Sequence, residues 1–283
     1  MKDQNHTAAK TTQIHLVKHT PEYWRVTFDN PPLNIFGPEM LPQVNEMITA
    51  VETDERVKVV VFDSAVEGFF LIHLDFLANL NDLAHLPPGP TGLHPWPEML
   101  VRLSRAPVVS IALIRGRATG MGSELALACD MRFASSERAI LSQFEVGAGL
   151  VPGGGPMARL TRLMGRGRAL ELILSANDMP GDLAERYGYV NRSLPDADLD
   201  GYVDALAARI ASFDKQTLMD TKRLINVASL PLDIELQSGW DACLASMARP
   251  ATQERIKKLI ERGFCKPGDA ENRLGDFVGQ IGR

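Results

Sequence analysis

Hydrophobic and polar residues follow two periodicities in the first half of the chain. In YWRVTF (residues 23–28) they alternate, which is typical of a strand with one buried face. From Glu39 to Glu52 the apolar residues recur at helical spacing instead, which predicts an amphipathic helix. VKVVVFDS (residues 57–64) and PVVSIALI (residues 107–114) are apolar at nearly every position, as in strands that are covered on both faces. The chain therefore begins as alternating strands and helices.

The pattern changes between the two buried strands and again after them. A helix is predicted from Asp75, a suitable N-cap, to Leu86, where PPGP ends it, and a loop is predicted for residues 85–93. Beyond VPGGGP (residues 151–156) helical spacing dominates, with one short strand near residues 189–194. The predicted helices of this part cover residues 157–175, 198–212, 215–227 and 250–262. Together these patterns predict an α/β core with an added helical region.

Composition narrows the classes of protein that the chain can represent. Its 45% hydrophobic and 23% charged residues are typical of a globular protein, and a net charge of −5 argues against a nucleic-acid partner. Cys129, Cys243 and Cys265 have no metal-ligand spacing, which argues against a metal site or a disulfide framework and fits a reducing compartment. No segment has the pattern of a secretory signal or a membrane span. We expect a cytoplasmic protein with a flexible tail at residues 1–13.

The stretch GRATGMGSELALACD (residues 116–130) is the first candidate for chemistry. It follows a buried strand and opens a helix, whose first N–H groups lack partners and lie at the positive end of the helix dipole. Such a turn suits a developing negative charge, and Glu124 stands beside it. The spacing of Gly116, Gly120 and Gly122 matches neither a dinucleotide-binding motif nor a phosphate loop. A purely structural alternative is that the glycines serve tight packing and Glu124 complements the dipole.

A second carboxylate and a histidine extend this set. Glu145, in FEVGAGLVPGGGP (residues 144–156), follows Glu124 by 21 positions, enough for a helix, a strand and a return to the same side of a sheet. Two carboxylates at one pocket suit general acid and base catalysis, although an arbitrary pair of glutamates is more often unrelated surface residues. His73, in FFLIHLDF (residues 69–76), stands in a strand-to-helix turn, where a histidine is more often structural than catalytic.

Three segments in this order resemble the crotonase superfamily, whose best-known members are enoyl-CoA hydratases and isomerases. They are VTFDNPPLNIFGPEML, APVVSIALIRGRATGMGSELALACDMRFAS and FEVGAGLVPGGGPMARLTRLMGRGRALELILSA. The similarity runs from about Trp24 to Asn226 and fades toward the C-terminus. It implies an α/β fold in which ββα units wind into a spiral over residues 14–212. It also implies a C-terminal helical region, residues 213–283, through which the chain assembles into trimers or hexamers.

The resemblance further implies an acyl thioester of coenzyme A as the substrate, with coenzyme A entering only as part of that substrate and no metal. The backbone N–H groups of Leu74 and Met121 would form an oxyanion hole for the thioester oxygen. Leu74 and Met121, together with Ile72 and Gly120 close to them in the sequence, would contact the substrate.

In the hydratases that the chain resembles, two glutamates flank the attacking water. Their counterparts here are Glu124 and Glu145, and the N–H group of Gly153 would help to position that water. The resemblance thus implies a hydratase-like lyase that adds water to the 2,3 double bond of an enoyl thioester through an enolate. The family also contains isomerases and hydrolases of acyl-CoA esters or diketones, so these reactions stay open, as does a non-catalytic binding scaffold.

The sequence departs from the family pattern at two positions. His73-Leu74-Asp75 stands where Gly-Ala-Asp or Gly-Ser-Asp is usual, and Met121 replaces a glycine. Any residue except proline keeps its N–H group, so the oxyanion hole can persist while the acyl preference changes. Both glutamates are retained, which favours a hydratase over the isomerases, since these usually keep one.

Overall fold

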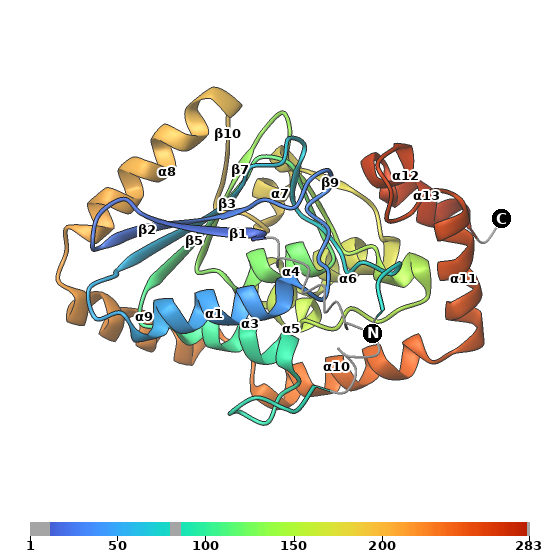
Figure 1. The fold of residues 1–283 in the computed structure, drawn as a ribbon, viewed down its shortest axis with the longest axis horizontal. Coiled ribbons are helices and arrows are strands. Elements are labelled where there is room, and N and C mark those ends of the chain that lie inside the picture. Colours follow the sequence, from blue (N-terminus) through green and yellow to red (C-terminus); the bar gives the residue numbers. More distant parts are fainter. Residues whose placement is uncertain (1–11, 80–85, 282–283) are drawn as a thin grey trace, which may run out of the picture.

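The computed structural model describes residues 12–79 and 86–281, which form two β-sheets surrounded by helices (Figure 1). The strands are β1 (Ile14–Lys18), β2 (Tyr23–Phe28), β3 (Val59–Ser64), β4 (Phe69–Leu71), β5 (Val109–Ile114), β6 (Arg117–Thr119), β7 (Met131–Ser135), β8 (Ile140–Ser142), β9 (Met179–Pro180) and β10 (Arg192–Leu194). The larger sheet has the order β1-β2-β3-β5-β7-β10, and the smaller one has the order β4-β6-β8-β9.

Helices follow or connect these strands. They are α1 (Met40–Thr53), α3 (Pro95–Arg105), α4 (Met121–Ala128), the 3-10 helix η1 (Glu145–Ala148), α5 (Pro156–Met164), α6 (Arg166–Ser175), α7 (Gly181–Tyr187), α8 (Asp196–Ala211), α9 (Lys215–Ser229), α10 (Asp233–Met247), α11 (Pro250–Glu261), α12 (Asp269–Asn272) and α13 (Leu274–Gln280).

The chain alternates between the two sheets as it proceeds. Strands β3, β5 and β7 enter the larger sheet, and each is followed by a strand of the smaller sheet, namely β4, β6 and β8. Neighbouring strands are parallel except in the pairs β1–β2 and β8–β9. Repeated strand-strand-helix units of this kind make the spiral of ββα units that the resemblance implied, so the predicted fold class is confirmed.

The larger sheet is covered on both faces, which explains its apolar strands. In β3, Val59 and Val61 pack with residues of α8, which lies along one face (Figure 1). Val60 and Phe62 point to the other face, into the main core that contains residues of α1, α3 and α4. A strand buried on both faces gains from an apolar residue at every position, so its sequence shows no alternation.

Most elements that the hydrophobic pattern predicted are present. The strands at residues 23–28, 57–64 and 107–114 and the helix at residues 39–52 are confirmed within a few residues. The helix predicted for residues 157–175 is divided at Gly165 into α5 and α6. Helices α3 and α10 were not predicted.

Two predicted elements include residues that the structure does not describe. The predicted start of the helix from Asp75 to Leu86 is wrong. Residues 75–79 form a turn instead, in which Asp75 Oδ1 accepts from the Leu77 N–H group at 2.9 Å. Residues 80–85 lie outside the described residues, and so does almost all of the predicted tail at residues 1–13. The loop predicted after residue 85 is confirmed for residues 86–93.

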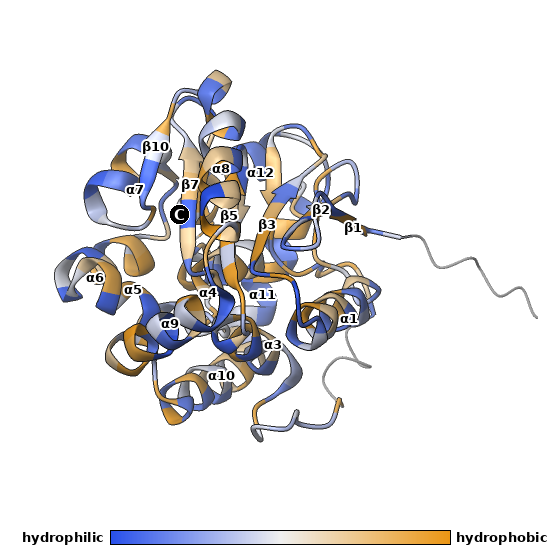
Figure 2. Ribbon diagram, turned by 90° about the vertical axis from the view of Figure 1, so that its left-hand side faces the viewer, coloured by the Kyte–Doolittle hydropathy of each residue, from blue (hydrophilic) through white to orange (hydrophobic). Residues whose placement is uncertain are grey.

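The C-terminal helices differ in how much of their apolar surface is buried. Helices α11 and α13 pack against η1 through a second apolar cluster that includes Leu259 and Val278. None of the described residues of α9 is buried, and Leu224, Ile225 and Val227 are 60–82% exposed. Figure 2 colours the ribbon, α9 included, by the hydropathy of each residue. No helix within residues 12–79 and 86–281 is long and apolar enough to cross a membrane. The boundary predicted at residues 212/213 stays a prediction.

Candidate active site

A buried asparagine holds the turn after β4 that carries Leu74. Asn34 adopts a positive φ of 52°, and its side-chain amide donates to Phe70 O and to Ser64 Oγ, both at 2.8 Å. Its own carbonyl accepts from the Ile72 N–H group at 3.0 Å. The proline-rich loop after β2 is thereby attached to the end of β4.

Two residues further on, Phe36 sets the direction of the Leu74 amide. Phe36 forms a parallel bridge with Leu74, in which its N–H group donates to His73 O at 3.0 Å and its carbonyl accepts from the Asp75 N–H group at 2.9 Å. Because these groups face Phe36, the N–H group of Leu74 points the opposite way. It has no acceptor among the described residues.

The start of α4 packs closely against the smaller sheet. A Cβ atom added at Gly122 would lie 1.7 Å from Leu71 O, so only glycine lets the helix approach this closely. The approach brings the first turn of α4, with the Met121 N–H group, beside the end of β4. Gly120 adjoins the second glutamate, since a Cβ atom there would lie 3.0 Å from Glu145 Oε1.

Two buried arginines stand at the opposite end of α4. Arg132 donates to Cys129 O at 2.8 Å, and Arg159 donates to Leu127 O at 3.4 Å. Cations at a helix C-terminus complement the helix dipole, which presents its positive end at Met121. The charge of Arg159 also acts to lower the pKa of Glu124.

Glu124 is a buried carboxylate with donors on both oxygens. Trp96 Nε1 donates to Oε2 at 2.7 Å, and the Gly154 N–H group donates to Oε1 at 2.6 Å. A Cβ atom at Gly154 would lie 2.3 Å from Glu124 Oε2, so a side chain there would displace the carboxylate. Burial raises the pKa of Glu124, and the hydrogen bonds from Trp96, Gly154 and Gly153 counteract that rise.

Glu145 is buried without such support. Its Oε2 atom has no hydrogen-bond partner among the described residues. Burial, and after it the negative charge of Glu124, raises the pKa of Glu145 well above its usual value. The two carboxyl groups therefore titrate as a coupled pair, in which the donors on Glu124 favour its ionised form and burial favours the neutral form of Glu145.

Both glutamates line one apolar cavity of about 130 Å³. Leu74, Met121 and Gly153 line it too, so five of the seven predicted site residues come together. The other two, Ile72 and Gly120, are not among its lining residues. Ile72 is fully buried, and Gly120 contacts the site through its neighbour Glu145.

The opposite wall of the cavity comes from α10. It consists of the side chains of Trp240, Cys243, Leu244 and Met247. Burial and the nearby glutamates raise the pKa of the Cys243 thiol to about 12, which keeps it neutral. No lysine or arginine of the described chain lines the cavity. Three or more His, Cys, Asp or Glu side chains are nowhere grouped to hold a metal ion in residues 12–79 and 86–281.

His73 has a structural environment. Its ring stacks on Phe264 at 4.2 Å, Nδ1 lies 2.8 Å from Leu74 O, and Nε2 lies 3.0 Å from Glu271 Oε2. Glu271, on α12, is completely buried, and its other oxygen accepts from the Cys265 N–H group at 2.6 Å. The ring thus connects the Leu74 turn to the C-terminal helices.

Sequence reasoning missed Trp96, Glu271 and the wall from α10. Trp96 is flanked by two prolines in HPWPEM, and a proline just before an apolar periodic stretch is a helix-start signal that could have located α3. Glu271 pairs with a residue 198 positions away, so no local pattern indicates the contact.

Comparisons with known proteins show the family to which the chain belongs. A sequence profile described as enoyl-CoA hydratase/isomerase matches residues 23–254. A short-chain-enoyl-CoA hydratase of Clostridium acetobutylicum is 33% identical over 204 residues, which are 71% of this chain and 76% of that protein. A crotonyl-CoA hydratase of Syntrophomonas wolfei is 32% identical over 70% of this chain and 76% of its own length.

Solved structures extend the similarity over nearly the whole chain. A crystal structure of a provisionally named enoyl-CoA hydratase from Streptomyces avermitilis has a TM-score of 0.90 and 40% identity, and the match covers 95% of this chain and 96% of that one. An enoyl-CoA hydratase from Mycobacterium avium has a TM-score of 0.77 and 25% identity, with 89% and 96% covered. The chain therefore belongs to the enoyl-CoA hydratase/isomerase family, also called the crotonase superfamily.

Proposed function

We propose that this protein is an enoyl-CoA hydratase that adds water across the 2,3 double bond of a short, uncharged enoyl thioester. The observation that carries the proposal is the unequal pair of buried glutamates, Glu124 and Glu145, in the same cavity as the Leu74 and Met121 turns. A hydration needs one group that accepts a proton from water and one that donates a proton to carbon. The pair offers one of each.

In this mechanism the thioester oxygen lies between the N–H groups of Leu74 and Met121. Glu124 takes a proton from the water, whose oxygen bonds to C3, and the electrons of the double bond move onto the thioester oxygen as an enolate. Glu145 then gives its proton to C2. Each donor to the oxyanion contributes about 3 kcal/mol to the barrier reduction, by analogy with measured oxyanion holes. The Gly153 N–H group, which contributes a hydrogen bond to Glu124, would help to position the water beside that carboxylate.

After the addition, the protonation states of the two glutamates are reversed. Glu124 carries the proton taken from water, and Glu145 is ionised. Because both carboxyl groups interact, a proton exchange between them or with solvent restores the starting state. The resting arrangement is favoured by the donors to Glu124.

An isomerase is the alternative reaction, since it uses the same enolate. It moves one proton between two carbons of the acyl chain, for which a single glutamate suffices. The second glutamate in the cavity favours hydration. A hydrolase would need the thioester carbon, rather than C3, to face the water, and a binding scaffold would have no use for two buried carboxyl groups.

The cavity limits the acyl group by size and charge. Its volume of about 130 Å³ is close to the roughly 150 Å³ of an engineered apolar cavity that binds benzene. An acyl group of about six carbon atoms fits this volume. An acyl group with a second carboxylate is disfavoured, because the described lining contains two glutamates and no lysine or arginine.

The proposal is tested with a panel of thioesters. Crotonyl-CoA should lose its conjugated-enoyl absorbance on addition of the protein, and mass spectrometry should detect a product heavier by one water. Glu124→Gln and Glu145→Gln should each lower the rate by two or more orders of magnitude while thioester binding is kept. Conversion of a 3-enoyl thioester without hydration of any 2-enoyl thioester would establish the isomerase instead.

The family resemblance also supports self-association through the C-terminal region. We propose that the chain forms trimers or pairs of trimers, in which the exposed apolar residues of α9 are covered by neighbouring copies.

A further inference from the structure

We propose that Trp96 is a positioning residue for the reaction, whose indole N–H group holds the Glu124 carboxylate in the orientation in which it accepts the proton of water. The inference rests on the proposed function, since it concerns the base of that mechanism. It concerns a side chain outside the three segments that carry the family resemblance.

The contact is direct and buried. Trp96 Nε1 lies 2.7 Å from Glu124 Oε2, and both side chains are at most 3% exposed. The other oxygen, Oε1, is occupied by the Gly154 N–H group. With a donor on each of its two oxygens, the carboxylate plane cannot rotate without breaking a hydrogen bond to a charged group.

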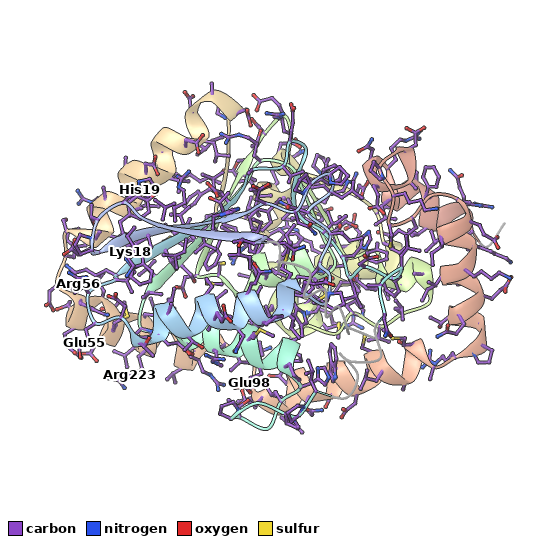
Figure 3. The ribbon with its side chains drawn as sticks, viewed as in Figure 1. Lys18, His19, Glu55, Arg56, Glu98 and Arg223 are labelled. Atoms are coloured by element: carbon purple, nitrogen blue, oxygen red, sulfur yellow. The ribbon has the colours of Figure 1, made fainter. Side chains whose placement is uncertain are left out.

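The indole is itself held in place from several sides. Its ring packs edge-on against Phe36 at 4.9 Å, next to the Leu74 turn. It lies in the first turn of α3, between Pro95 and Pro97, where proline restricts the backbone. Glu98, labelled in Figure 3, accepts hydrogen bonds from the backbone and hydroxyl of Thr91 and so fixes the preceding loop to the same turn.

The contact also distinguishes the two glutamates. Glu124 has a side-chain donor, and Glu145 Oε2 has none within the described residues. If Trp96 were only a packing aromatic, phenylalanine would serve equally well at this position. If it positions the base, the loss of one N–H group alone must change the titration of the pair.

Trp240 offers a matched control. It lines the same cavity, and its Nε1 atom is buried without an acceptor among the described residues. Trp96→Phe and Trp240→Phe therefore remove the same chemical group from the same cavity, but only the first group contacts a glutamate.

The first experiment compares the pH dependence of kcat/KM for crotonyl-CoA. Removing a donor to the ionised form raises the pKa of Glu124, so the acid limb of the Trp96→Phe profile should move to higher pH by about one unit. Below that limb the variant should lose about tenfold in kcat/KM, with kcat carrying most of the loss. The acid limb of Trp240→Phe should keep its position, whatever the change in KM. An acid limb at the same pH in the wild type and in Trp96→Phe would overturn the proposal.

A second experiment needs no turnover. The chain has three tryptophans and hence three indole N–H resonances, and Trp96→Phe identifies the one that belongs to Trp96. In the full-length protein this resonance should shift with pH, and it should stop shifting in Glu124→Gln. If none of the three indole resonances responds to pH or to Glu124→Gln, the proposal is overturned, and this result needs no folded Trp96→Phe. If the wild type hydrates no thioester, the proposed function fails, while this titration still decides whether Trp96 senses Glu124.

Discussion

His73→Ala tests how strongly the site depends on the C-terminal helices. The change removes a ring whose two nitrogens face Leu74 O and Glu271 Oε2, and it leaves Glu271 completely buried with the Cys265 N–H group as its remaining described partner. Leaving a buried charged group without its partner costs about 3–5 kcal/mol. At roughly 2–4 °C per kcal/mol for a protein of this size, the melting temperature should fall by about 6–20 °C.

The assay is thermal and urea unfolding followed by circular dichroism, with His15→Ala as the control. His15 also faces a carboxylate, Asp29 at 3.5 Å, but both side chains are more than 40% exposed. An exposed pair contributes about 0–1 kcal/mol, so this variant should unfold almost like the wild type. A second variant, His73→Ala with Glu271→Ala, should recover part of the loss, because it no longer buries an unpaired carboxylate.

Two results would refute this reasoning. If His73→Ala unfolds within about 1 kcal/mol of the wild type, the buried contact with Glu271 does not stabilise the fold as argued. If the variant stays folded and binds thioester but loses a thousandfold or more in hydration, His73 takes part in proton transfer. The proposed mechanism would then be wrong.

Three further predictions concern the acid, the oxyanion hole and α9. Burial raises the folded-state pKa of Glu145, so this group stabilises the fold below about pH 4.5, and that contribution is lost as the pH rises. Glu145→Gln should therefore have a higher melting temperature than the wild type at pH 8 and a flatter pH dependence of stability. Leu74→Pro should abolish hydration and Leu74→Ala should keep it, each judged on protein with an intact melting transition. Val227→Lys should shift the native mass toward one chain of 31.1 kDa, and a wild type that already has this mass would contradict the trimer.

The hydrophobic pattern predicted the core because local sequence and burial coincide there. Strand β3 is apolar throughout since both of its faces are covered, and α1 repeats with the helical period since one face is buried. The helix predicted after Asp75 was wrong at its start, because an aspartate that suits an N-cap suits an isolated turn equally well.

Motifs in the sequence located most of the candidate site, and the residues that were missed reach it through tertiary contacts. Glu124 and Glu145 meet in one cavity, as their place in two glycine-rich segments suggested. Trp96, Trp240 and Glu271 reach the site from α3, α10 and α12, and each contact joins residues 28 to 198 positions apart. Such contacts depend on how helices pack, and no spacing within one segment encodes them.

The cavity has two walls of different origin, and this bears on how the enzyme could change its substrate. On the side of the core, Gly122 and Gly154 leave no room for a side chain, so substitutions there displace the groups that would do the chemistry. On the other side, α10 contributes Leu244 and Met247, which contact the cavity and are not among the groups assigned to proton transfer or to the oxyanion. Variation on α10 can therefore alter acyl preference while the reaction stays the same. A small library at these two positions is the natural starting point for redirecting the enzyme to longer or branched thioesters.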